Sequence, residues 1–205
     1  MPNDFTQAIQ EVAMETEDNL IVFVRTAQSF EEFYKKLVSS FLNKLQEELM
    51  KKFPEENGWR FFAIDLIAEK YKSWGYLLYV HSESWSSPIL RVGIWADTRF
   101  NNVEYGIGWD KEKDSTHHRQ LHDHIFTKMS QRFQGGTRNK WQPFFIRNHF
   151  KFSDWSKEDA IISMRQVIKG EPPAGILDFF CNELVAIVEA LDNCLKGWSQ
   201  CNPNP

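Results

Sequence analysis

The spacing of apolar residues changes near residue 54, and this change limits the chain to folds that combine helices with a sheet. Before Pro54 the apolar residues recur at the spacing of one helix face. Ser29 and Glu32 form a capping-box pattern at the start of this series. We therefore predict a long amphipathic helix from Ser29 to Phe53. Its apolar positions are Phe30, Phe33, Tyr34, Leu37, Val38, Phe41, Leu42, Leu45, Leu49 and Phe53.

The segment before this helix is harder to assign. Residues 4–15 are expected to be helical. The sequence NLIVFV at 19–24 is short and rich in β-branched residues, so it fits either a strand or the buried start of a helix. Both interpretations of residues 19–24 stay open.

After residue 58 the spacing shifts toward the alternation of strands. Four strands are expected, at 59–68, 75–81, 89–97 and 103–109. The connections between them are short and polar, whereas a parallel crossover needs about a dozen residues or more. We therefore predict an antiparallel meander of four or more strands.

The carboxyl half is predicted to be largely helical. A helix over 115–134 is followed by a strand-like or irregular segment at 140–152. Ser156 and Asp159 are typical of a helix start, and Gly170 of its end. A final helix is expected over 174–196.

These elements predict an α+β fold, in which the meander sheet packs against the long helix and the helical carboxyl half. With 205 residues the chain is expected to form one globular domain over 1–200, followed by a frayed tail at 201–205. The 8 Trp and 17 Phe residues predict a core rich in aromatic rings.

Composition also bears on location. No apolar run approaches the roughly 20 residues that span a bilayer, and the first residues lack a cationic start followed by an apolar stretch. A cytoplasmic protein without a membrane partner is expected. Cys181 and Cys194 lie too far apart on one predicted helix to bond each other, and Cys201 makes the cysteine count odd, so free thiols are predicted.

The net charge of −4 hides a strong segregation of charge along the chain. Residues 1–24 contain acids but no Lys or Arg, and the segment after 170 is acidic except for Lys196. Residues 124–153 contain cations and no carboxylate. These cations are Lys128, Arg132, Arg138, Lys140, Arg147 and Lys151.

The same segment alternates its cations with aromatic rings, a mixture typical of surfaces that bind a phosphate backbone and stack bases. The predicted contact residues are Lys128, Arg132, Arg138, Lys140, Trp141, Phe144, Arg147 and Lys151. Trp74, Trp85 and Trp95 are expected to be exposed at the rim of the sheet. In the alternative interpretation, the rings face the core and the cations pair with the acidic ends.

Four histidines lie between 117 and 124. His118 and His122 share a helix face and could bind zinc or manganese, with Asp123 orienting a ligand or adding an oxygen. Arg119 opposes a divalent cation at this place. We favour the interpretation that His118 and His122 border the apolar face, while His117 and His124 are solvated.

Acidic residues on the predicted sheet offer a second metal hypothesis, that of a magnesium nuclease. Asp65 and Glu69 would lie about 13 Å apart along one strand, too far to share an ion. We interpret the set as strand-end and surface charges. Its members are Asp65, Glu69, Asp97, Glu104 and Asp110.

Three stretches together resemble the carboxyl-terminal half of certain PD-(D/E)XK-nuclease-like proteins of prokaryotes and phages. They are GWRFFAIDLIAEKYKSWGYLLYV, PILRVGIWADTRFNNVEYGIGWD and WQPFFIRNHFKFSDWSKEDAI, followed by the helix FFCNELVAIVEAL. In that family the nuclease motif lies in the amino-terminal half, which has no counterpart here. The resemblance implies an accessory or partner-binding module without the nuclease core.

The leading hypothesis is thus a non-enzymatic cytoplasmic binding protein without a cofactor, which contacts nucleic acid or a protein through residues 126–152. The alternative is a metal-dependent hydrolase or nuclease built on the histidines of 115–134. A homodimer formed through the long helix or a sheet edge is a further hypothesis.

Overall fold

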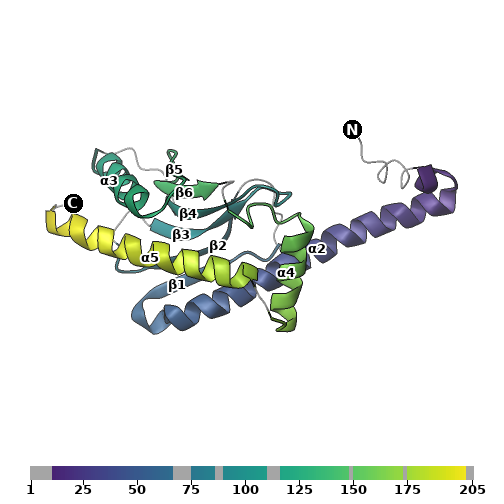
Figure 1. Cartoon of the computed structure of the whole chain (residues 1–205), viewed down its shortest axis with the longest axis horizontal. Helices are drawn as coiled ribbons and strands as arrows, with labels where there is room; N and C mark the ends of the chain where they lie inside the picture. Colours follow the sequence, from purple (N-terminus) through teal and green to yellow (C-terminus); the bar gives the residue numbers. More distant parts are fainter. Residues whose placement is uncertain are drawn as a thin grey trace.

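The computed structural model describes residues 11–66, 75–85, 90–109, 116–147, 150–172 and 175–201, except the side chains of 27, 28, 116, 117, 200 and 201 (Figure 1). It has an α+β fold, as the sequence predicts. The helices are α2 (Glu17–Lys52), η1 (Glu55–Asn57), α3 (Thr116–Arg132), α4 (Glu158–Lys169) and α5 (Gly175–Cys201). The strands are β1 (Trp59–Ala63), β2 (Gly75–Ser82), β3 (Leu90–Ala96), β4 (Val103–Trp109), β5 (Gly136–Thr137) and β6 (Phe144–Arg147).

The strands form one antiparallel sheet in the order β1-β2-β3-β4-β6-β5. The predicted meander is therefore confirmed for β1 to β4. The pair β6 and β5 extends it from the edge of β4, because β6 pairs with β4 across the helix α3 that separates them in the sequence.

The helices cover one face of this sheet (Figure 1). Alternation along β4 directs Tyr105 to that face, where its ring meets the rings of Phe179 and Phe180 on α5 at 5.8 and 6.0 Å. The Tyr105 hydroxyl also donates a hydrogen bond of 3.0 Å to Glu183. The opposite face carries a different set of side chains, which form the candidate site.

The core is rich in aromatic rings, as predicted. Phe180 lies at its centre, with the rings of Phe41 at 6.4 Å and Trp155 at 5.6 Å. Phe41, Trp155 and Phe180 are fully buried and come from α2, the segment before α4, and α5. Aromatic contact thus joins elements that are distant in the sequence.

The long helix begins at Glu17, so the predicted start at Ser29 is wrong. The N-cap is Thr16, whose hydroxyl accepts a hydrogen bond of 3.1 Å from the Asn19 amide. A capping box stabilises a helix start by only about 1 kcal/mol, and it does not end a helix that is already formed upstream. Residues 19–24 are helical, and residues 20–24 are exposed, so they form neither a strand nor the buried start of a helix. The helix enters the core only at Leu37.

The other boundaries agree in part. β1 ends at Ala63, residues 67–74 lie outside the described residues, and the two-residue strand β5 has no predicted counterpart. Ser156 does not cap α4, because its hydroxyl donates to Asp154 at 2.6 Å and Lys157 holds the N-cap position. Gly170 ends α4 in the left-handed conformation with φ of 68°, as predicted.

The cysteine prediction is confirmed for the described side chains, in which Cys181 and Cys194 are free thiols. Burial raises the pKa of the Cys194 thiol to about 11, so it is protonated at neutral pH. Across the described ranges, every helix is too short or too polar to cross a membrane. Residues 202–205 of the expected tail lie outside the described residues.

Candidate binding site on the open face of the sheet

The face turned away from the helices, here called the open face, carries the alternate residues of each strand. Along β4 these are Glu104, Gly106 and Gly108, because Val103, Tyr105, Ile107 and Trp109 belong to the helical face. The register places Trp95 of β3 and Arg147 of β6 on either side of Glu104. A carboxylate, a guanidinium and an indole therefore meet at the middle of the sheet.

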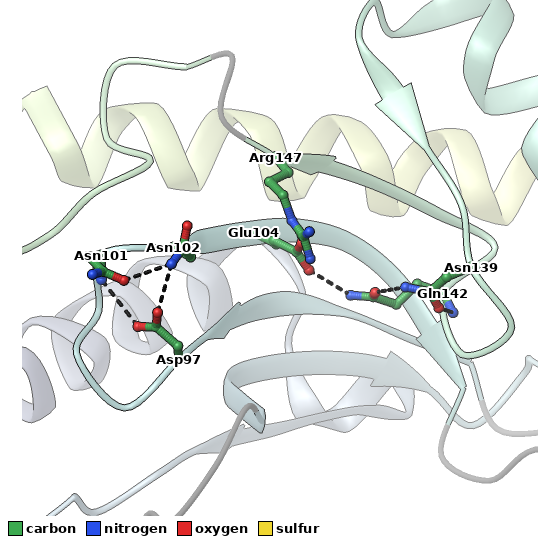
Figure 2. Close-up of polar contacts among 7 residues, drawn as sticks. All are labelled: Asp97, Asn101, Asn102, Glu104, Asn139, Gln142 and Arg147. Atoms are coloured by element: carbon green, nitrogen blue, oxygen red, sulfur yellow. Dashed lines mark hydrogen bonds and ion pairs between the residues drawn. The ribbon is translucent and has the colours of Figure 1, made fainter.

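Glu104 is completely buried and is held by two side chains (Figure 2). Arg147 donates through Nε to Oε1, and Gln142 donates through Nε2 to Oε2 at 3.3 Å. Burial raises the pKa of Glu104, and the two hydrogen bonds partly oppose that change. The prediction that Glu104 is a surface charge is wrong, because β3 and β6 flank it on both sides.

Asp97, another member of the predicted acidic set, does lie at a strand end. Its carboxylate accepts hydrogen bonds from the backbone of Arg99 and Asn101 and from the side chain of Asn102 (Figure 2). These bonds close the turn between β3 and β4. Asp65 is exposed, while Glu69 and Asp110 lie outside the described residues.

The loop between β5 and β6 is fixed beside the open face by Asn139. Its side-chain oxygen accepts from the amides of Trp141 and Gln142 at 2.8 and 2.9 Å, and its Nδ2 donates to Gln142 Oε1 at 2.6 Å. The Trp109 amide donates to the Trp141 carbonyl at 3.0 Å, which ties the loop to β4. The Trp141 ring is nevertheless 46% exposed. The loop thus presents an indole from a rigid support.

A pocket of about 500 Å³ lies between this loop and the strands. Its size falls in the range of small-molecule sites, about 300–1,000 Å³. The rings of Tyr76 and Trp95 are 4.7 Å apart at one wall. The lining residues are Gly75, Tyr76, Trp95, Trp109, Asn139, Trp141, Gln142 and Arg147.

Gly108 allows the rings of the pocket wall to lie across the strand. A Cβ at this position would be 2.5 Å from Tyr76 Oη and 2.7 Å from Trp95 Cζ2. Any side chain at position 108 would therefore displace both rings. The alternation of Glu104, Gly106 and Gly108 in the sequence is the signal that could have located this pocket.

The ring surface continues across the open face toward β1. Phe62 and Tyr79 stack with centroids 5.1 Å apart and planes inclined by 18°. The Arg91 guanidinium lies 4.2 Å from the Tyr79 centroid and 5.5 Å from that of Tyr76. All four side chains are half-buried. Aromatic and cationic groups therefore extend from β1 to the pocket.

The expectation that the rings of 126–152 face solvent is wrong for several of them. Phe144 is fully buried, with Phe133 at 5.8 Å, so it does not belong to an exposed contact surface. Phe145 and Phe152 are buried too, whereas Trp141 is exposed as predicted. The rim residues Trp85 and Trp95 are also buried, and Trp74 lies outside the described residues.

Four of the six predicted cations lie at two places, a groove on the helical side and the pocket on the open face. Lys128 and Arg132 line a groove of about 450 Å³ between α3 and α5, on the helical side. Lys140 lies 4.9 Å from the Trp141 centroid, and Arg147 lines the pocket. The pocket therefore unites Trp141 and Arg147 of the predicted set, and Lys140 lies beside it against the Trp141 ring.

The two remaining cations of the set are held by nearby groups. Arg138 forms an ion pair with Asp123 and lies 4.5 Å from the Phe126 centroid. Lys151 lies 5.1 Å from the Phe152 centroid.

Three histidines of α3, His118, His122 and His124, are engaged in packing or hydrogen bonding, and the side chain of His117 lies outside the described ones. His118 is buried with its ring 4.1 Å from that of Trp109, and His122 Nε2 is 2.8 Å from the Asn139 carbonyl oxygen. His124, expected in solvent, is half-buried against Trp198, and this desolvation lowers its pKa. Within the described residues, no group of three or more metal-binding side chains occurs.

Comparisons with protein-family models, with curated proteins and with solved structures found no match to this chain. The resemblance to PD-(D/E)XK-nuclease-like proteins therefore stays a prediction.

Proposed function

We propose that this protein binds single-stranded nucleic acid on the open face of the sheet, with an unstacked base in the pocket beside Trp141. The observation that supports this most directly is the union of Trp141 and Arg147 with the rings of β2 and β3 around one pocket, beside which Lys140 lies against Trp141. Proteins that read single strands stack bases on aromatic rings and arginine planes of a sheet surface. The proposal is one of binding without catalysis.

Charge favours a nucleic acid over a protein as the partner. Glu104 is fully buried, so its carboxylate is not offered to a ligand, whereas Lys140 and the Arg147 side chain are exposed. Phosphates would lie near Lys140 and the exposed part of the Arg147 guanidinium, whose charge Glu104 partly balances, and Arg91 extends the cationic surface across β3. Each stacked base contributes about 1–3 kcal/mol, more than the roughly 0–1 kcal/mol of an exposed ion pair. The indole is therefore the residue whose removal matters most.

Trp141→Ala is expected to weaken binding of a labelled single-stranded oligonucleotide about 10-fold or more, because one stacking surface is lost. Fluorescence anisotropy at two salt concentrations measures the affinity.

Lys140→Ala is expected to weaken binding less and to reduce the slope of log affinity against log salt by about one, as for the loss of one phosphate contact.

Two matched variants locate the contact. Trp198→Ala removes an indole that lies against His124 on the helical side, and Lys128→Ala with Arg132→Ala removes the cations of the groove. Both variants should bind the oligonucleotide with the affinity of the unaltered protein. Absence of binding by the unaltered protein at low salt would exclude the proposal. If Lys128→Ala with Arg132→Ala abolishes binding while Trp141→Ala binds normally, the nucleic acid contacts the helical side and the proposed site is wrong.

A further inference from the structure

The amino-terminal part of α2, with the helical residues 11–14 and the bend that joins them to it, is an unusually apolar and exposed segment, here called the overhang (residues 11–33). In Figure 1 it extends away from the sheet and the other labelled helices. Most of the exposed large apolar side chains of the described residues lie on it, and the others are Trp141 and Ile162. Those of the overhang are Val12, Met14, Leu20, Ile21, Val22, Phe23, Val24, Phe30 and Phe33.

The overhang exposes many apolar side chains to water, which is energetically unfavourable. The helical part, residues 17–33, is about 25 Å long at 1.5 Å per residue. An isolated helix of this length is marginal in water, and monomeric proteins rarely expose contiguous apolar patches of more than a few hundred square ångströms. Phe23 is 42% exposed, Phe30 61% and Phe33 58%. Burial against another molecule would stabilise both the helix and its side chains.

We propose that a second copy of this chain covers the overhang, with the two α2 helices antiparallel. The tip carries Glu11, Glu15, Glu17 and Asp18, and residues 11–24 contain no Lys or Arg. Parallel pairing would place the two acidic tips together. Antiparallel pairing places each tip beside residues 34–41 of the other copy, where Lys35 and Lys36 are the only charged residues.

Charge also selects a register. A pairing centred on Thr26 places Glu17 of one copy opposite Lys35 of the other, because the two positions are equally distant from 26. Lys35 already forms an ion pair with Glu31 at 2.7 Å, so the approaching carboxylate joins an existing charged cluster. Each tip then reaches the region where the other copy's α2 packs against α4.

The distribution of apolar residues around the helix fits this arrangement better than a simple two-helix contact. A helix that meets one partner needs only one apolar stripe, whereas residues 20–24 are apolar at five successive positions and so face every direction. In the antiparallel dimer the overhang contacts the other copy's α2 on one side and that copy's folded body on another. Ile162 of α4, which is 46% exposed, lies on the helix that packs beside α2.

Sedimentation of the full-length chain tests the oligomeric state. The unaltered protein is expected to be a dimer at micromolar concentration, and Phe23→Glu with Phe30→Glu to be a monomer. Ser130→Glu with Gln131→Glu is the matched control, because it adds the same charge at exposed helical positions of α3, outside the proposed interface. Tryptophan fluorescence should be unchanged in both variants, since every tryptophan lies outside the overhang and neither variant alters a buried residue.

Cysteine cross-linking tests the orientation, with Cys181, Cys194 and Cys201 replaced by Ala. Thr26→Cys lies at the centre of the antiparallel pair and should form a covalent dimer on oxidation. Glu17→Cys should not, because the two positions would be about 27 Å apart along the helix axes. Efficient cross-linking through Glu17→Cys would show a parallel pair and overturn the proposed orientation.

Three results would overturn the proposal as a whole. One is an unaltered protein that stays monomeric at micromolar concentration. Another is a dimer that persists in Phe23→Glu with Phe30→Glu, since the interface would then lie elsewhere. The third is a monomer that binds neutral phosphatidylcholine vesicles through the overhang, which would assign the overhang to a lipid surface. None of these results depends on nucleic-acid binding.

Discussion

Phe180→Ala is expected to lower the free energy of unfolding by about 3–5 kcal/mol, as for other buried aromatic residues. The side chain is fully buried and touches rings from three other parts of the fold. Phe41 and Tyr105 lie at 6.4 and 6.0 Å, and Trp155 at 5.6 Å. Its loss would leave a cavity where α2, β4 and α5 meet. Guanidinium denaturation measures the change, which is a large part of the 5–15 kcal/mol typical of a domain.

Two variants calibrate this result at the same protein concentration. Phe180→Leu keeps much of the buried volume and should cost less than Phe180→Ala. Trp141→Ala removes a larger ring that is 46% exposed, and it should cost less than about 1 kcal/mol. A similar loss for Phe180→Ala and Trp141→Ala would contradict the central position of Phe180. The small loss for Trp141→Ala also shows that its effect on binding is not an effect on folding.

The elements of the fold follow from local patterns to a large extent. Alternation along 103–109 separates Tyr105 and Ile107 from Glu104, and helical spacing after residue 36 identifies the buried face of α2. The pairing of β6 with β4 does not follow, because it joins segments separated by α3 and depends on contacts made only in the folded chain. The sequence does not indicate the early start of α2, because its first turns are not buried and no single apolar face marks them.

Some residues of the candidate site can be predicted from the sequence pattern, and others only from the folded sheet. Lys140, Trp141 and Arg147 were found because cations and rings alternate in their segment. Tyr76 and Trp95 come from β2 and β3, and only the sheet register brings them to the same pocket. The burial of Phe144 does not follow from the sequence, because a short strand covered on both faces has no polar side to its pattern.

Arg147→Ala is expected to lower the free energy of unfolding by about 3 kcal/mol at neutral pH, because it leaves the buried Glu104 carboxylate without its charged partner. Arg165→Ala is the matched control, since its ion pair with Glu171 is exposed and should contribute about 0–1 kcal/mol. The double variant Glu104→Gln with Arg147→Ala has no buried charge and should recover most of the loss. Guanidinium denaturation of the three variants measures these differences.

The pH dependence of this loss identifies its cause. Burial raises the pKa of Glu104 above its ordinary value of 4.5, while Arg147 lowers it, so removing Arg147 raises the pKa further. Between the unfolded and folded pKa values the native state binds a proton that the unfolded chain does not, and stability falls as pH rises through this window. The deficit of Arg147→Ala should therefore shrink as pH falls from neutral toward 4.5, and the double variant should show no such trend. A deficit that is constant with pH would mean that Arg147 stabilises the sheet by packing, and that the Glu104 charge is not the cause.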